Sequence, residues 1–178
     1  MNKLIAVVGM AGAGKTTASD IFTGLGYTKI RFGQATMDEI TRRGLEVNEE
    51  NESFIRETLR IEHGMDAYAK LNEPKIREAI KRQSVVIDGL YSWQEYLYLK
   101  PKFPELKLVA IHSSPTTRYK RLSGRKERPL TFEEAQSRDY SELENIHKSE
   151  PIAMADFTIV NEGTVDELKM KINELGKK

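Results

Sequence analysis

The sequence predicts an α/β fold in which a five-stranded parallel sheet lies between two layers of helices. Short apolar runs alternate along the chain with longer amphipathic stretches, and strands that alternate with helices form parallel sheets covered on both faces. The first apolar run leads directly into a glycine-rich turn and then a helical pattern, which is a common first unit of such folds. Because the 178 residues contain no evident linker, we expect one domain spanning 1–178.

Each predicted strand is a short apolar run beside polar or turn-forming residues. The runs are Lys3–Val8, Tyr27–Phe32, Ser84–Asp88, Leu106–His112 and Asp156–Val160. The amphipathic stretches predict helices at Lys15–Gly24, Ala35–Gly44, Asn51–Lys70, Glu73–Arg82, Trp93–Lys100, Thr116–Ser123, Thr131–His147 and Val165–Leu175. Two connections are long and helical: the one between the second and third strands contains an insertion at about 34–82, and the one between the fourth and fifth contains an insertion at about 121–140. We expect both to overhang the carboxyl ends of the strands, where ligands of open α/β sheets bind.

Composition and charge narrow the functional classes. Charged residues make up 31% of the chain and hydrophobic residues 39%, an ordinary balance for a globular protein. A formal net charge of +1 does not favour nucleic acid or an anionic membrane as a partner. The absence of cysteine excludes disulfides, thiolate metal sites and cysteine nucleophiles. The first apolar run is too short for a membrane span and resembles no signal peptide, so we expect a cytoplasmic protein.

The segment Gly9–Thr16 matches the phosphate-binding pattern G-x-x-x-x-G-K-[ST], between the first predicted strand and the first predicted helix. Glycines let successive backbone N–H groups face one anion, and the helix start adds unpaired donors and a positive dipole end. Lys15 is expected to reach the outer phosphates as a catalytic residue, and the Thr16 hydroxyl to ligate Mg²⁺. The residues expected to bind ATP here are Gly9, Ala11, Gly12, Ala13, Gly14, Lys15, Thr16 and Thr17.

Asp88 ends the apolar run Val85–Asp88, which has the general form of a second nucleotide-binding motif. In that role Asp88 would orient Mg²⁺, directly or through a water molecule, together with Thr16. The alternative is a plain strand end, because aspartate also favours turns. Gly89 follows and would allow a substrate to approach the backbone closely.

Arginines gather in the second insertion, where Arg121 and Arg125 stand four residues apart and Arg138 follows in the next predicted helix. On a helix this spacing places Arg121 and Arg125 on one face. Phosphoryl transfer requires positioning and charge neutralisation, and a well-placed arginine contributes about 10³–10⁵ in rate. The alternative is a solvated basic helix end that is favoured by the helix dipole. The arginines are therefore candidates for a lid over the transferring phosphate.

Together these segments resemble the P-loop kinases of nucleoside monophosphates and of dephospho-coenzyme A. Ile87–Gly89 is similar to the Asp-Gly pair of adenylate-type kinases, and Arg121–Arg125 is similar to the start of their lid. The resemblance implies that Arg121 lies by the base of ATP and that Arg125 acts on the transferring phosphate. Arg138 with the next acid is similar to a later element of the same lid, which implies a catalytic role.

The stretch Ala155–Thr164 resembles the last strand of dephospho-coenzyme A kinases, whose following turn contacts adenine. The resemblance implies that Asn161 takes part in ATP binding. The whole layout also resembles a group of archaeal adenylate-kinase-related proteins. It implies a nucleoside-monophosphate-kinase-like fold in which the insertion at about 34–82 binds the acceptor and the segment at about 121–140 is the lid.

The differences from these families fall on the acceptor side. Adenylate-type kinases carry an arginine shortly after Asp-Gly, where this chain has Leu90–Ser92. They also have an acid and an arginine after the second strand, where Phe32–Thr36 stands here. Dephospho-coenzyme A kinases have an aspartate base near that place, and Gln34 cannot act as a base. The candidate acceptor residues are Phe32, Gly33, Arg43, Arg60, Asp88 and Gly89, and Arg56 is a further candidate clamp.

The leading hypothesis is a magnesium-dependent phosphotransferase that moves the γ-phosphate of ATP to a small phosphorylated acceptor, with a nucleoside monophosphate as the first candidate. A dephospho-coenzyme A kinase is the alternative enzyme. An adenine-nucleotide-dependent switch or assembly ATPase, which would act through a protein partner, is an alternative of another class. A guanine-nucleotide switch is not favoured, because Tyr91 stands where D-x-x-G requires glycine and the chain has no N-K-x-D. The sequence leaves the acceptor and the oligomeric state open.

Overall fold

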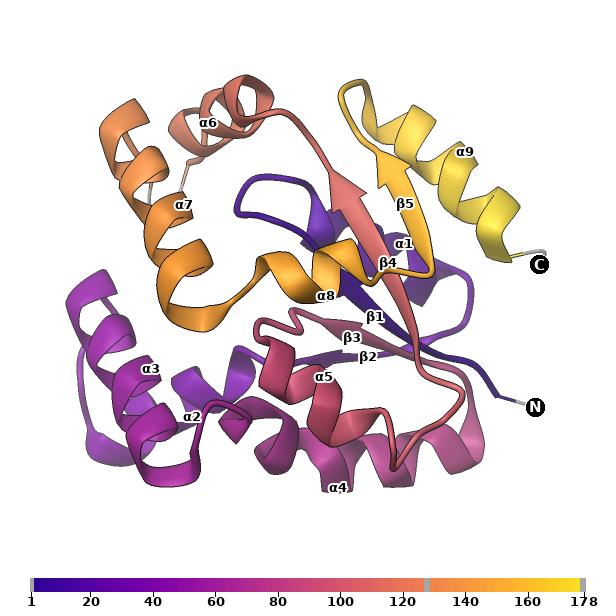
Figure 1. Cartoon of the computed structure of the whole chain (residues 1–178), viewed down its shortest axis with the longest axis horizontal. Helices are drawn as coiled ribbons and strands as arrows, with labels where there is room; N and C mark the ends of the chain where they lie inside the picture. The colour runs from indigo at the N-terminus through magenta and orange to yellow at the C-terminus, as the bar shows by residue number, and fades with distance from the viewer. Residues whose placement is uncertain (1, 127–128, 177–178) are drawn as a thin grey trace.

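The computed structural model describes residues 2–126 and 129–176, so residues 127–128 of the predicted lid lie outside it. Within these residues a five-stranded sheet forms the middle layer (Figure 1). Its strands are β1 (Leu4–Val8), β2 (Thr28–Arg31), β3 (Val85–Asp88), β4 (Lys107–His112) and β5 (Phe157–Val160). They pair in the order β2-β3-β1-β4-β5, and every pair is parallel. The predicted fold class is confirmed.

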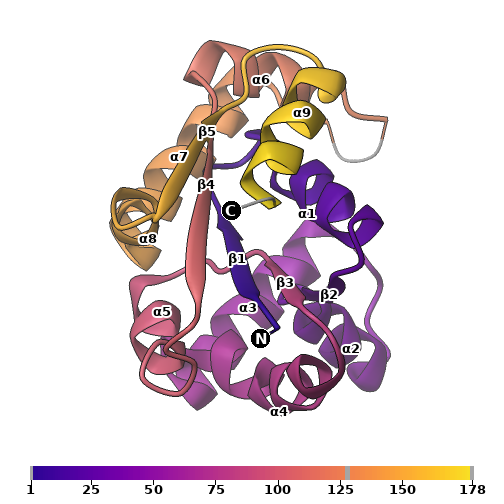
Figure 2. The ribbon, with the colours of Figure 1, turned by 90° about the vertical axis from the view of Figure 1, so that its right-hand side faces the viewer.

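Helices cover both faces of this sheet (Figure 2). They are α1 (Lys15–Gly24), α2 (Gln34–Arg43), α3 (Glu49–His63), α4 (Ala67–Arg82), α5 (Trp93–Leu99), α6 (Pro115–Ser123), α7 (Phe132–Ile146), α8 (Ser149–Ala153) and α9 (Val165–Gly176). Helices α1 and α9 contact each other on one face, whereas α4 and α5 lie on the other with α8. No helix in the described part of the chain is long and apolar enough to cross a membrane.

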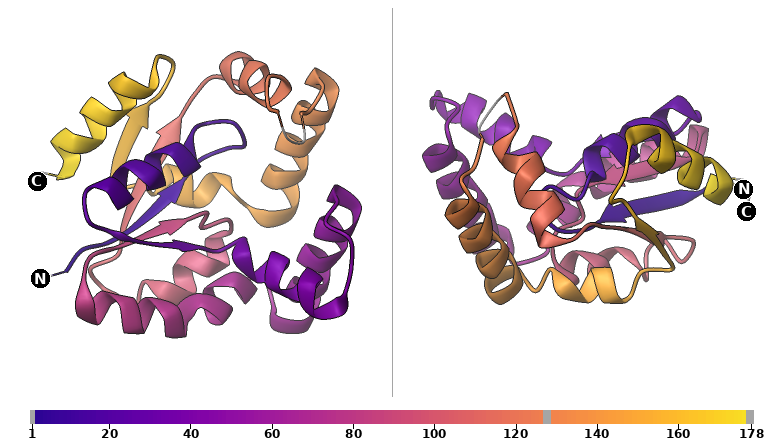
Figure 3. Two further views of the ribbon diagram at one scale, coloured as in Figure 1. Left: turned by 180° about the vertical axis from the view of Figure 1, so that it is seen from behind. Right: turned by 90° about the horizontal axis from the view of Figure 1, so that it is seen from above.

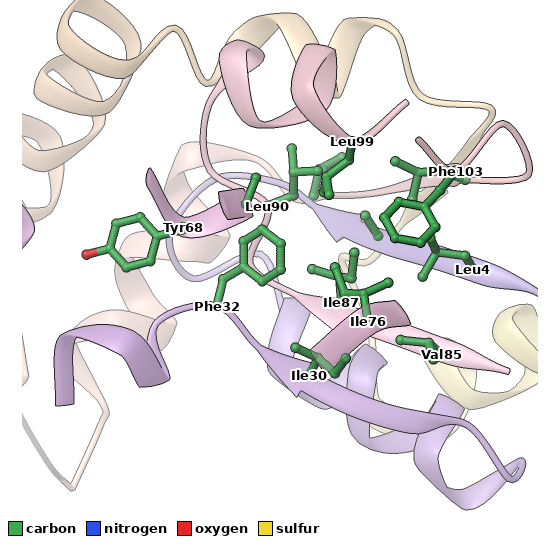
Figure 4. Close-up of a cluster of buried hydrophobic side chains, with 14 of the residues drawn as sticks. Leu4, Ile30, Phe32, Tyr68, Ile76, Val85, Ile87, Leu90, Leu99 and Phe103 are labelled. Atoms are coloured by element: carbon green, nitrogen blue, oxygen red, sulfur yellow. The ribbon is translucent and has the colours of Figure 1, made fainter. Parts of the chain in front are cut away.

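The side chains of β1 alternate between two cores, as the period of a strand requires. Leu4, Ala6 and Val8 face the larger core, which α4 and α5 close, while Ile5 and Val7 face the core under α1 and α9. Figure 4 shows the larger core, with aromatic and branched side chains from β2, β3 and α4 packed over the sheet. Burial on both faces explains why the strands are continuous apolar runs in the sequence.

The first helical insertion differs from its prediction at one helix boundary. The expected break near residues 70–73 is wrong, because α4 runs without interruption through Pro74. The break lies instead at Gly64, whose φ of 92° is accessible to glycine and strained for other residues. Helix α4 persists because Tyr68 and Ile76 are buried in the larger core, which outweighs the backbone hydrogen bond that proline removes.

The second insertion contains a helix that the sequence pattern did not indicate. After α7, His147 adopts a left-handed φ of 50° and the chain turns into the short helix α8. Helix α8 contacts β4 and α5, which fixes it against the sheet. Figure 1 and the left view of Figure 3 place α3 and α7 beyond the carboxyl ends of the strands, on either side of the turn that follows β1.

Candidate functional site

The turn after β1 has a backbone shape that only its glycines allow. Gly9, Gly12 and Gly14 have φ values of 146°, 79° and 101°. A Cβ atom at Gly12 would lie 2.7 Å from the carbonyl oxygen of Arg118, and one at Gly14 would lie 2.5 Å from Nδ2 of Asn161. The loop is therefore held in a conformation and at a packing distance that exclude side chains, as a cradle of backbone N–H groups requires.

Helix α1 begins at Lys15, directly after this loop, so its first backbone N–H groups are available to an anion. Thr16 is exposed at this end and Thr17 is half-buried. Nζ of Lys15 donates to the carbonyl oxygen of Met10 at 3.0 Å, which folds the side chain back over the loop. Burial, and next the charge of Lys148, lower the pKa of the Lys15 ammonium to about 7. A bound phosphate would stabilise its charged form.

The loop is supported from the opposite side by β4 and β5. Nδ2 of Asn161 donates to the carbonyl oxygen of Ala13 at 2.8 Å, and the Ser113 hydroxyl donates to the carbonyl oxygen of Asn161. Asn161, which was predicted to contact ATP, is buried and uses its amide on the protein itself. Asn161 still borders the loop, because its side chain occupies the position that a Cβ atom at Gly14 would take.

A buried ion pair between Arg118 and Asp139 joins the loop to the second insertion. Two nitrogens of the guanidinium donate to the two carboxylate oxygens at 2.8 and 2.6 Å. The same guanidinium donates to the carbonyl oxygens of Ala11 and Ser113, each at 3.1 Å. Tyr119 adds a third donor to Asp139 at 2.9 Å. Arg118 therefore links α6, α7 and the loop.

The three predicted lid arginines have different surroundings. Arg121 donates to the Ser113 hydroxyl at 3.0 Å and to the carbonyl oxygen of Gly163 at 3.3 Å, so it lies by the turn after β5. Arg125 is exposed and follows Gly124, the residue that ends α6. Arg125 lies beyond the end of α6, so α6 does not place it on one face with Arg121. Nε of Arg138 donates to Glu142 at 3.2 Å.

Lys148 is the residue of this region that sequence reasoning missed. It is 2% exposed, and its Nζ donates to Glu142 at 2.6 Å, so Glu142 binds Arg138 and Lys148 together. Burial opposes the ionisation of Glu142, but Lys148 and Arg138 outweigh it and lower its pKa to about 2. No local signal distinguishes Lys148 from an exposed lysine, because the sheet and the lid bury it from two directions.

Asp88 lies at the end of β3 and is almost completely buried. Its Oδ2 is 3.3 Å from Nζ of Lys29, and its charge acts on Lys15. A hydroxyl at Thr16 and a carboxylate at Asp88 are the oxygen donors that Mg²⁺ prefers. The described residues contain no group of three or more acidic or histidine side chains that could hold a metal. This donor set suits an ion that keeps water and phosphate ligands rather than an all-protein cage.

Two of the predicted acceptor residues, Gly33 and Gly89, lie next to Tyr91. Its hydroxyl oxygen would lie 3.3 Å from a Cβ atom at Gly33, and the Tyr91 ring occupies the Cβ space of Gly89, whose φ is 90°. Phe32 is fully buried, and its side chain belongs to the larger core (Figure 4). Gly33 and Gly89 thus border the partly buried phenol of Tyr91.

The arginines of the first insertion divide into paired and unpaired groups. Arg43 binds Glu39 at 2.6 Å, and Arg56 binds Glu49 at 2.6 Å. Arg60 has no carboxylate partner among the described residues. Its guanidinium carbon lies 5.5 Å from the centroid of the Tyr68 ring, and its Nε is buried without a hydrogen bond.

Glu95 contributes a buried carboxyl group next to these residues. Its Oε2 accepts from the backbone N–H groups of Tyr91 and Ser92, at 2.6 and 3.2 Å, as part of the capping box of α5. Its Oε1 has no hydrogen-bond partner in the described part of the chain. Burial raises the pKa of Glu95 to about 7. The pattern Ser92-x-x-Glu95 is the sequence signal that could have identified it.

Comparisons with known proteins agree with this architecture. A family model described as an AAA domain matches residues 5–142. A UPF0200 protein of Thermococcus sibiricus is 38% identical over 98% of this chain and 94% of its own length. A UPF0200 protein of Thermococcus gammatolerans is 36% identical with the same coverage.

Solved structures of kinases share the fold at low sequence identity. A shikimate kinase from Bacteroides thetaiotaomicron superposes with a TM-score of 0.65 at 17% identity, over 99% of both chains. A gluconokinase from Sinorhizobium meliloti has a TM-score of 0.58 at 17% identity, over 98% of this chain and 94% of its own. The fold is therefore that of P-loop kinases.

Proposed function

The chain belongs to the AAA domain family and to the UPF0200 proteins, and from that premise we propose that it is an ATP-dependent phosphotransferase. It moves the γ-phosphate to a small phosphorylated acceptor, with a nucleoside monophosphate as the first candidate. The observation that carries the proposal is the convergence of the glycine cradle, Lys15, Arg138 and Asp88 at the carboxyl ends of the strands. Such a site supplies the positioning and the positive charge that phosphoryl transfer needs.

On the donor side, the loop Gly9–Thr16 holds the β- and γ-phosphates through backbone N–H groups, and Lys15 leaves the carbonyl oxygen of Met10 to bind them. Thr16 and Asp88 would hold Mg²⁺, directly or through water, and the bound ion would neutralise phosphate charge. Arg121 lies by the turn after β5, where it can cover the base. Arg138 and Arg125 close over the phosphates from the lid at about 121–140.

On the acceptor side, Arg60 is the best clamp for the acceptor phosphate. Arg43 and Arg56 already bind glutamates, so a phosphate would have to displace those carboxylates. Arg60 has no such competitor in the described part of the chain, and its buried Nε lacks a hydrogen-bond acceptor. The Arg60 guanidinium can therefore bind a phosphate without first displacing a carboxylate.

The paired arginines also favour one alternative. If Arg43 and Arg56 serve only to stabilise α3 and its contact with α2, the insertion at about 34–82 could bind a protein instead of a phosphorylated acceptor. The chain would then act as an adenine-nucleotide-dependent switch with slow hydrolysis.

The deciding experiment measures ADP production from Mg-ATP with AMP, CMP, UMP, GMP, dTMP or dephospho-coenzyme A, and without an acceptor. The proposal expects one acceptor to stimulate turnover strongly and to yield a phosphorylated product. A flat panel with slow background hydrolysis would contradict it and favour the switch.

Lys15→Ala provides the control for the assignment of the loop. We expect at least about a hundredfold loss of stimulated turnover, since removal of one preorganised charged donor has effects of that size. The midpoint of urea unfolding should change little, because the Lys15 ammonium makes one hydrogen bond to a carbonyl oxygen. Full activity in a folded variant would overturn the role of Lys15.

A further inference from the structure

Two cations share one carboxylate beside the loop. Other carboxylates are paired elsewhere: Lys29 lies by both Asp20 and Asp88. Arg56 binds Glu49 and Glu52, and Arg118 binds Asp139. Glu142 is shared between two cations, Arg138 and Lys148. Lys15 has no carboxylate within ion-pair distance among the residues that the structure describes. Arg138 and Lys148 therefore depend on one carboxylate.

Lys148 is held on the sheet side of the site rather than in the lid. It is the residue before α8, and α8 contacts β4 and α5. Its Nζ lies 5.5 Å from the centroid of the Tyr91 ring, whose edge fills the Cβ space of Gly89 after β3. Its charge is also the strongest of those that act on Lys15. Lys148 thus stands between the phosphate loop and the predicted acceptor residues.

Glu142 and Arg138 reach the same place from the lid helix α7. The Glu142 carboxylate accepts from Nζ of Lys148 at 2.6 Å and from Nε of Arg138 at 3.2 Å. The Arg138 side chain remains 42% exposed, so a ligand can reach it. Buried or half-buried cations that share one anion favour a further anion, because each charged donor is costly to leave unpaired.

We propose that Lys148 and Arg138 form a binding site for the phosphoryl group that is transferred, and that Glu142 is the counter-anion that occupies both cations while that group is absent. This inference rests on the proposed binding of ATP at the loop. The simpler explanation is a structural ion pair, because the backbone N–H of Lys148 also donates to the carbonyl oxygen of Glu142 and closes the end of α7. The experiment must therefore separate ligand binding from folding.

The test measures the affinities for ATP and ADP by calorimetry, in the same magnesium buffer and without an acceptor. Lys148→Met removes the charge and keeps the length of the side chain, and Lys148→Arg keeps the charge. Lys107→Met is the matched control, because Lys107 is an exposed lysine that binds Asp156 at 2.7 Å at the far end of β4. We expect Lys148→Met to lower the affinity for ATP by at least about tenfold, which corresponds to the loss of one charge-assisted hydrogen bond. The affinity for ADP, which lacks the γ-phosphate, should fall by less than about threefold.

Lys148→Arg and Lys107→Met should both retain ATP affinity. Equal losses for ATP and ADP, or no loss for either in a folded Lys148→Met variant, would overturn the proposal. A rise in the KM for the acceptor with unchanged ATP affinity would also overturn it, since Lys148 would then serve the acceptor alone. Glu142→Gln tests the counter-anion, because it should bind ATP at least as tightly as the parent; weaker binding would contradict that role.

These outcomes differ from those that test the proposed function. Loss of ATP and ADP binding in Lys15→Ala establishes the nucleotide site whether or not an acceptor is found. A flat acceptor panel combined with an ATP-selective loss in Lys148→Met would refute the kinase and keep the phosphoryl site. Stimulated turnover combined with an unaffected Lys148→Met variant would do the reverse.

Discussion

Glu95 caps a helix with a carboxylate that is buried away from water. Its carboxylate accepts two backbone hydrogen bonds at the start of α5, yet it is completely buried. Burial raises its pKa above the usual value, despite those bonds and the charges of Arg60 and Lys148. The ionised form is therefore less stable in the folded protein than in the unfolded chain.

This shift gives a pH dependence with a defined sign. A carboxyl group whose pKa is raised from 4.5 to about 7 on folding contributes stability below pH 4.5, and that contribution is lost as the pH rises through about 7. The unfolding free energy of the parent protein should fall by up to about 3 kcal/mol between pH 5 and pH 8, as Glu95 ionises. In Glu95→Gln, which cannot ionise there, we expect this fall to be absent. Urea unfolding of both proteins across this range checks it. Parallel curves would show that Glu95 does not titrate there.

At the scale of elements, the pair Arg118–Asp139 connects the helices α6 and α7 to the phosphate loop. The pair is buried and bidentate, and the guanidinium also donates hydrogen bonds to the carbonyl oxygens of Ala11 and Ser113. The Arg118 guanidinium therefore links Asp139 of α7 directly to the backbone of the loop. Helix α6 also approaches Gly12 closely, so α6 and the loop form one packed unit.

Breaking this pair should destabilise the protein strongly. Arg118→Ala leaves the Asp139 carboxylate buried without its cation, and we expect a loss of about 3–5 kcal/mol of unfolding free energy. The double variant Arg118→Met with Asp139→Leu should recover most of it, because no buried charge remains. Guanidinium unfolding measures both. A small loss in the single variant would mean that water reaches Asp139.

At the scale of the whole molecule, two helical insertions lie on either side of the phosphate loop. Helices α2 and α3 come from one insertion, and α6 and α7 come from the other (Figures 1 and 3). Both lie beyond the carboxyl ends of the strands, as the topology of an open parallel sheet requires of a ligand site. In the proposed function the first insertion brings the acceptor to the donor, and Arg60 is its contact.

Replacing Arg60 tests this arrangement. Arg60→Met should raise the KM for the acceptor by about tenfold or more and leave the KM for ATP unchanged, because a charged contact to the acceptor alone is lost. Arg42→Met is the matched control, since Arg42 is an exposed arginine paired with Glu39 on α2. Steady-state kinetics with the acceptor found in the panel measures both. An unchanged acceptor KM would assign the clamp to another residue.

Much of the molecule could be predicted from local patterns. The predicted strands match β1 to β5 within one or two residues at their ends, because continuous apolar runs report burial on both faces. The phosphate loop was recognisable because its function requires glycine at fixed positions. The break between α3 and α4 was misplaced, because α4 is held through Pro74 by the burial of Tyr68 and Ile76, which is a tertiary contact and not a local pattern.

The sequence by itself determined the fold class, the strand positions and the loop Gly9–Thr16, because each depends on neighbouring residues. The tertiary structure alone decided which charged groups meet. It paired Arg118 with Asp139, buried Lys148 against Glu142 and left Arg60 without a carboxylate in the described residues. These outcomes depend on the distance between side chains from separate elements, and that distance is set by how the two insertions pack on the sheet.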